Sequence, residues 1–137
     1  MAAAEVESGA KLLYRNIDFN TYGVLNATED FITNHADVAQ VVVDSYEKAR
    51  TWALENPDET AQLLADAASI DIDVAKRVIN ERTNLGVSGV PGEAQVEVFK
   101  KIAPTIAESG DVKGGQEAVD KAIDTIIYNS FALKATE

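Results

Sequence analysis

The chain has 137 residues, of which 46% are apolar and 26% charged, a composition that suits one globular domain or part of a larger one and excludes a disordered chain. Its formal net charge of -11 disfavours nucleic acid and anionic membranes as partners, because both are themselves negatively charged. It has no cysteine and no long apolar run, so we expect no disulfide, no thiolate metal site and no membrane insertion.

The N-terminal quarter of the chain predicts little regular structure. Residues 1–9 are expected to be a disordered leader, and they lack the basic start and the long apolar stretch of a signal peptide. Residues 11–15 and 21–25 are short apolar runs, which we predict as two β-strands. The residues between these runs are rich in turn formers.

Helical patterns follow. Asn26 or Thr28 can cap a short helix, and a long helix is predicted over residues 37–55. Asn56 is expected to cap the next helix by accepting hydrogen bonds from its free amides, and Pro57 fits the first turn, where no amide donor is needed. The apolar residues of the long helix have helical spacing and are expected to form one buried stripe: Val38, Val41, Val42, Ala49, Trp52 and Ala53.

The C-terminal half of the chain also predicts helices. Asp71 can cap a helix that runs to about Arg82, and a glycine-rich loop over 86–92 precedes a helix over 93–109. Pro104 should kink that helix, and Gly110 should end it. A last helix precedes a loose tail over 129–137. The expected fold class is therefore mainly α with two short β-strands, and residues 10–128 are expected to form one domain.

The order and spacing of several segments resemble a known family. These are 9–13 followed by 22–31, then 34–37, 49–53 in the long helix, Asn-Pro-Asp-Glu at 56–59, and 95–103 followed by 108–112. In this order they are similar to the C-terminal part of ABC-transporter substrate-binding proteins for aliphatic sulfonates, taurine and nitrate, of the type 2 periplasmic-binding-protein family. The resemblance implies the C-terminal portion of an α/β fold in which two lobes enclose a ligand.

The resemblance also implies a function and partners. The chain would be part of a solute-binding protein that serves an ABC transporter permease in the periplasm, with a small oxyanion as ligand and no cofactor. A half-cleft cannot enclose a ligand, since affinity requires most of the ligand surface to be buried. We therefore expect the chain to be binding-deficient until the missing lobe is supplied. The alternative is a stand-alone helical module that self-associates through exposed apolar faces.

Candidate ligand contacts lie in the segment 16–26, where the two apolar runs are joined. Asn16, Asn20 and Tyr22 can donate hydrogen bonds to an anion such as a sulfonate, and plain turn chemistry is the alternative explanation for them. Enzymatic activity is not expected. His35 is the only histidine. It would have to serve every serine as the base of a catalytic triad, and no cysteine or second histidine completes a metal site with it.

Overall fold

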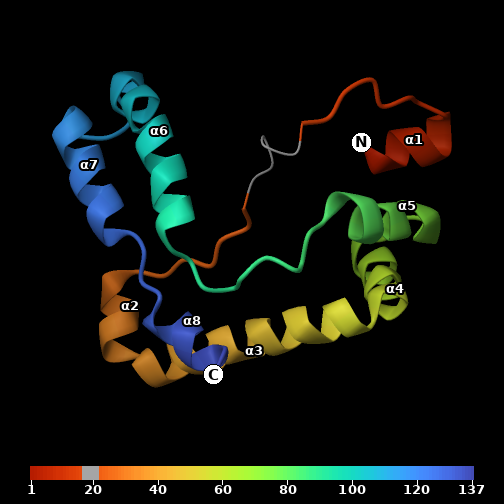
Figure 1. Ribbon diagram of the computed structural model, residues 1–137, viewed down its shortest axis with the longest axis horizontal. Helices are drawn as coiled ribbons and strands as arrows, with labels where there is room; N and C mark the ends of the chain where they lie inside the picture. Colours follow the sequence, from red (N-terminus) through yellow and green to blue (C-terminus); the bar gives the residue numbers. More distant parts are fainter. Residues whose placement is uncertain (17–21) are drawn as a thin grey trace. The chain divides into compact units, whose positions relative to one another are not determined.

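The computed structural model describes residues 1–16 and 22–137, and all regular secondary structure in them is helical (Figure 1). The elements are α1 (Ala2–Ser8), α2 (Glu29–Asn34), α3 (Ala36–Glu55), α4 (Pro57–Ala68), α5 (Ile72–Arg77), the π-helical turn η2 (Val78–Arg82), α6 (Glu93–Ser109), α7 (Gly115–Thr125) and α8 (Ser130–Ala135). Among these residues no helix combines the length and the apolar character that crossing a bilayer requires.

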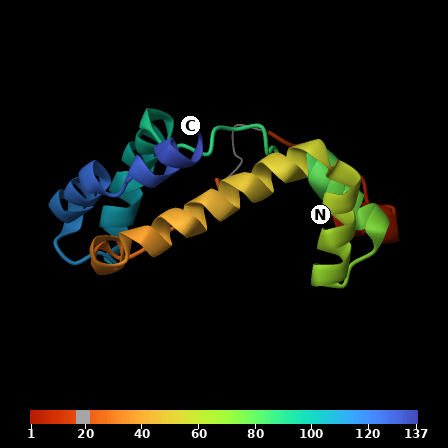
Figure 2. The same cartoon turned by 90° about the horizontal axis from the view of Figure 1, so that it is seen from below.

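The chain divides into two compact units. Met1–His35 and Lys48–Val87 form the first unit, and Ala36–Glu47 and Ser88–Glu137 form the second. Helix α3 is continuous and contributes to both units (Figure 2). The segment expected as a leader contains α1, and the segment expected as a tail contains α8. The division into a leader, a domain over 10–128 and a tail stays a prediction.

The prediction of two β-strands, and with it of an α/β fold, is wrong for the described residues. Residues 11–15 and 22–25 have no regular structure, and Thr21 lies outside the described residues. A strand is stable only when its backbone groups pair with a neighbouring strand, and neither run has one. Leu13 is 95% exposed, so these apolar side chains also lack a surface to pack on.

Most helix boundaries follow the predicted capping chemistry. The Thr28 hydroxyl accepts a hydrogen bond from the Phe31 amide at 3.2 Å and caps α2, and Asp71 does the same for the Asp73 amide at 2.8 Å at the start of α5. Gly110 ends α6 with φ 78°, a left-handed conformation that suits glycine. These three local predictions are confirmed.

Asn56 corrects the expected capping of α4. It stands at the N-cap and Pro57 is the first helical residue, as predicted, but its side chain accepts no bond from the α4 amides. Instead its amide Nδ2 donates to the Trp52 carbonyl oxygen at 2.8 Å, so the side chain supplies a hydrogen bond to a carbonyl group at the C-terminal end of α3. An asparagine amide both donates and accepts, so it can serve either of the two helix ends that meet here.

Small side chains form the core of the first unit. Ala61 of α4 and Ala75 of α5 are fully buried, and Ala65 is nearly so. Because alanine is small, it lets two helices approach closely. The larger side chains Leu64, Ile70, Ile72 and Ile79 pack around this centre and stay partly exposed.

The second unit centres on a hairpin of α6 and α7. Ala103 of α6 packs with Val119 and Ile123 of α7, and Val96, Phe99, Ala107 and Val112 surround them. Gly114 is the N-cap of α7 and has φ 97°, and a Cβ added there would lie 2.9 Å from the Cβ of Ala118. Only glycine fits this position without strain.

The predicted burial of the apolar stripe on the long helix is wrong. Val41 is 63% exposed, and Val38, Val42 and Trp52 are exposed as well, whereas Ala39 is the buried residue of α3. Helical spacing identifies which side chains share a face of a helix. It does not identify the element that covers that face.

Candidate functional site

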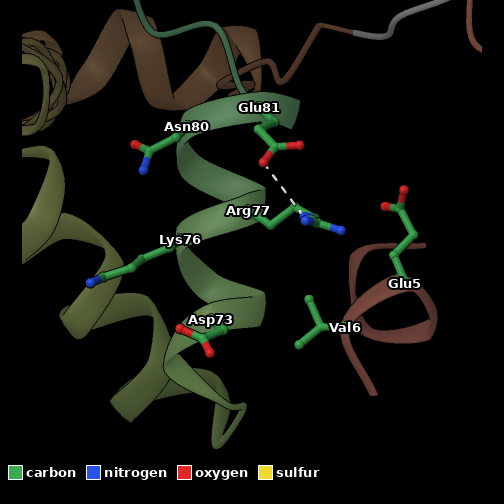
Figure 3. A pocket seen from close by; sticks show the side chains of 7 residues that line it. All are labelled: Glu5, Val6, Asp73, Lys76, Arg77, Asn80 and Glu81. Carbon is green, nitrogen blue, oxygen red and sulfur yellow. Dashed lines mark ion pairs between the residues drawn. The ribbon is translucent and has the colours of Figure 1, made fainter. Parts of the chain in front are cut away.

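The candidate site is a hollow of about 400 Å³ in the first unit, between α1 and the α5–η2 helix (Figure 3). Its lining is mostly charged and comprises Glu5, Val6, Asp73, Lys76, Arg77, Asn80 and Glu81. Asp73, Arg77 and Glu81 follow one another at four-residue spacing, which places their side chains on one face of a helix. Figure 3 shows Arg77 extending towards the side of α1, while Lys76 and Asn80 extend from the other side of the helix.

Glu5 and Arg82 connect the two sides of this hollow. Nη2 of Arg82 donates to both carboxylate oxygens of Glu5, at 2.8 and 3.1 Å. Both side chains are largely buried, with exposed fractions of 10% for Glu5 and 17% for Arg82. Charge-assisted hydrogen bonds in partly buried surroundings are among the stronger polar contacts in proteins, so this pair fixes α1 on η2.

Glu81 joins further basic groups to the same cluster. Its carboxylate lies 3.5 Å from Nε of Arg77 and 3.9 Å from Nη2 of Arg82. Nη1 of Arg15 donates to the Glu81 backbone oxygen at 2.9 Å and attaches the segment after α1 to the same turn. The cluster therefore connects Glu5 and Arg15, near the N-terminus, with residues 77–82.

The electrostatics of the cluster favour an ionised Glu5. The hydrogen bond from Arg82 lowers the pKa of the Glu5 carboxyl below its ordinary value of 4.5, and partial burial opposes this shift. The positive charges of Arg82, Arg77 and the N-terminal amine lower the pKa further. The carboxylate thus behaves as a bound anion.

The chemistry of the lining suits hydrogen bonding to a polar or charged molecule. The residues that line the hollow include no histidine, serine or other nucleophile with a base beside it. The described residues also contain no group of three histidine, aspartate or glutamate side chains that could hold a metal ion. Carboxylates, guanidinium groups and an amide can recognise a small polar or charged molecule through hydrogen bonds.

The residues predicted as ligand contacts lie elsewhere. Asn16 is half-buried and Tyr22 is exposed, and neither lines the hollow, while Asn20 lies outside the described residues. Their role in ligand binding stays a prediction. His35 is exposed, and its ring lies 5.5 Å from that of Phe31, centroid to centroid.

Sequence reasoning missed Glu5, Arg77 and Arg82. The four-residue spacing of Arg77 and Glu81 is a signal for an ion pair along a helix and could have been used. Glu5 and Arg82 are 77 positions apart in the sequence, so no local sequence pattern indicates that they form a pair.

Comparisons with known proteins add one distant relationship. No family model and no solved structure matches the chain. The chain is 26% identical over 136 residues to a protein of Bacillus subtilis (strain 168) that is named as a candidate aliphatic sulfonates-binding protein. The match covers 96% of this chain but only 38% of that protein, so the chain spans less than half the length of this relative. The chain is therefore distantly related to a substrate-binding protein.

Proposed function

We propose that the chain is part of a solute-binding protein of an ABC importer, with small oxyanions such as aliphatic sulfonates, taurine or nitrate as its ligand class. One observation carries the proposal: the match to a relative named for binding aliphatic sulfonates extends along 96% of this chain. The proposal includes a periplasmic location, an importer permease as the partner and no catalytic role.

The proposal also holds that the chain binds its ligand poorly by itself. A binding site buries most of its ligand among a few converging polar groups. In the part of the chain that the structure describes, the hollow beside α1 is open, and the cations Arg77 and Arg82 are paired with carboxylates. The remaining 62% of a protein as long as the relative would supply the rest of the pocket, because the match covers 38% of it.

A chimera tests this proposal. The chain replaces the matching segment of the Bacillus subtilis relative, and the chimera is titrated with an aliphatic sulfonate, taurine and nitrate in a calorimeter. Binding of one of these anions with one site per chain is expected. The complete relative serves as the positive control, and the relative without the matching segment serves as the negative control.

The folding of the chimera decides how a negative result is understood, so its thermal unfolding and sedimentation are measured first. A cooperatively unfolding, monomeric chimera that binds none of the anions contradicts the proposal. If the chimera does not fold, the chain is added in trans to the shortened relative, and the absence of restored binding in the mixture contradicts the proposal equally.

A second candidate function is a helical module that self-associates. Val98, Ile102 and Ile106 follow at four-residue spacing on α6 and are exposed, so they form an apolar stripe on that helix. Sedimentation equilibrium of the chain at rising concentration tests it. A dimer that Ile102→Lys dissociates, while Glu108→Gln on the same helix does not, supports the module, because both variants change the net charge by one and Glu108 lies off the stripe; a monomer at all concentrations contradicts it.

A further inference from the structure

The contact between Glu5 and Arg82 has the chemistry of an occupied oxyanion site. A guanidinium group holds a carboxylate through two hydrogen bonds, at 2.8 and 3.1 Å, in largely buried surroundings. Arginine recognises carboxylates, sulfonates and phosphates with the same planar set of donors. What distinguishes this site is that its occupant belongs to the chain itself.

Arg82 has a donor that Glu5 does not use. Its Nε is buried and has no hydrogen-bond partner among the described residues, although Nη2 donates to both Glu5 oxygens. A buried donor without an acceptor is unfavourable. In this arrangement both carboxylate oxygens accept from Nη2 and neither accepts from Nε, whereas a sulfonate carries a third oxygen that can accept from Nε while the others accept from Nη2.

The local charge balance suits a single negative charge in the place of Glu5. Arg77 and Arg82 face the two carboxylates of Glu5 and Glu81, and the lining residues Lys76 and Asp73 balance each other. Arg15, whose Nη1 donates to the Glu81 backbone oxygen, and the N-terminal amine add positive charge at this cluster, so removal of the Glu5 carboxylate leaves uncompensated positive charge there. This charge lies beside the hollow of about 400 Å³, because Glu5 also lines it.

Helix α1 is short and is not part of the buried centre of the first unit. It has seven residues, packs on α5, and is followed by residues 9–16, which have no regular structure. The buried centre at Ala61, Ala65 and Ala75 lies in α4 and α5 and does not include α1. Helices this short have little stability of their own, so their position depends on such contacts.

We infer that Arg82, assisted by Arg77, forms a binding site for a small monoanionic oxyanion, and that Glu5 occupies this site as an internal competitor. A sulfonate binds by displacing the Glu5 carboxylate and by accepting hydrogen bonds from Nη2 and Nε of Arg82. The inference rests on the proposed function only for the choice of a sulfonate as the oxyanion.

The test compares Glu5→Ala with Glu7→Ala in the complete chain. Both variants remove one carboxylate from α1, but Glu7 is exposed and has no ion pair with Arg82, so it controls for net charge and for helix propensity. The probe is methanesulfonate, titrated while the Nε–H resonance of Arg82 is followed by NMR. Glu5→Ala is expected to bind roughly tenfold to a hundredfold more tightly than the wild type, because no charge-assisted hydrogen bond has to be broken.

Each remaining comparison has a definite outcome. Glu7→Ala is expected to bind like the wild type, and equal affinities of Glu5→Ala and Glu7→Ala overturn the inference. The Arg82 Nε–H resonance should shift on saturation, and an unchanged resonance in Glu5→Ala overturns the inference as well. Acetate, with one oxygen fewer, should bind several-fold more weakly than methanesulfonate; equal affinity overturns the role of Nε.

This experiment is independent of the chimera. If Glu5→Ala gains no affinity while the chimera binds a sulfonate, the inference fails and the proposed function stands. If Glu5→Ala gains affinity while the chimera binds nothing, the proposed function fails and the site on Arg82 stands.

Discussion

Glu5 and Arg82 lie 77 positions apart in the chain, and the two hydrogen bonds between them join α1 to the end of η2. Few other contacts hold this short helix. Ala2 is its buried residue, and Val6 lines the hollow beside α5. The position of α1 therefore depends in part on the charge of one carboxylate.

We predict that α1 detaches in acid. The pKa of Glu5 is lowered in the folded chain, so its ionised form contributes stability that is present above its ordinary value of 4.5. This contribution is lost as the pH falls below 4.5 through the lowered pKa of the folded state. Amide hydrogen exchange should show α1 losing protection in this range, after correction for the intrinsic exchange rate.

The matched control for acid detachment is Glu5→Gln, which cannot ionise. In this variant the protection of α1 should be low and nearly independent of pH. Equal protection of the wild-type α1 above and well below pH 4.5 would show that the ion pair does not hold the helix.

Ala61→Leu should destabilise the first unit. Ala61 is fully buried between α4 and α5, and a larger side chain there forces the helices apart, at a cost of about 1–3 kcal/mol. Ala67→Leu places the same side chain on the exposed side of α4 and should change the free energy of unfolding by less than about 0.5 kcal/mol. Urea-induced unfolding measures both free energies. An Ala61→Leu variant as stable as the wild type would refute the packing described for α4 and α5.

Ile123→Ala tests the core of the second unit. Ile123 is 8% exposed and packs on Ala103, so its truncation leaves a cavity and should cost about 2–4 kcal/mol. Ile126, which follows α7, is 60% exposed, and Ile126→Ala is the control with an expected cost below about 1 kcal/mol. Thermal unfolding of the two variants should separate them clearly; similar melting temperatures would contradict the α6–α7 core.

Gly114→Ala should weaken the turn into α7. Its φ of 97° disfavours any side chain, and the added Cβ would lie 2.9 Å from the Ala118 Cβ, so we expect a loss of about 1–3 kcal/mol. Gly23→Ala is the control, because that glycine has no atom within 4 Å of the added Cβ. Circular dichroism during urea denaturation measures the difference, and equal stabilities would count against the described turn.

The sequence predicts helix ends well because capping is local chemistry. Thr28, Asp71 and Gly110 each act within three residues of their own position, through a side-chain oxygen or a left-handed backbone. Pro57 likewise marks the first turn of α4 through its own geometry. None of these effects requires knowledge of the rest of the fold.

The sequence does not predict features that depend on distant partners. The apolar runs at 11–15 and 22–25 would need a neighbouring strand, and none of the described residues provides one. Val41 belongs to a regular apolar stripe, yet burial requires an element above it. Glu5 could pair with any basic residue in the chain, so its contact with Arg82 emerges only from the fold.

The affinity of the chimera for an aliphatic sulfonate, set against that of the 137-residue chain alone, tests the central claim most directly. We predict that the chimera binds at least about a hundredfold more tightly, because the remainder of the protein encloses the ligand. A folded chimera that binds no more tightly than the isolated chain would contradict the claim that this chain is part of a solute-binding protein.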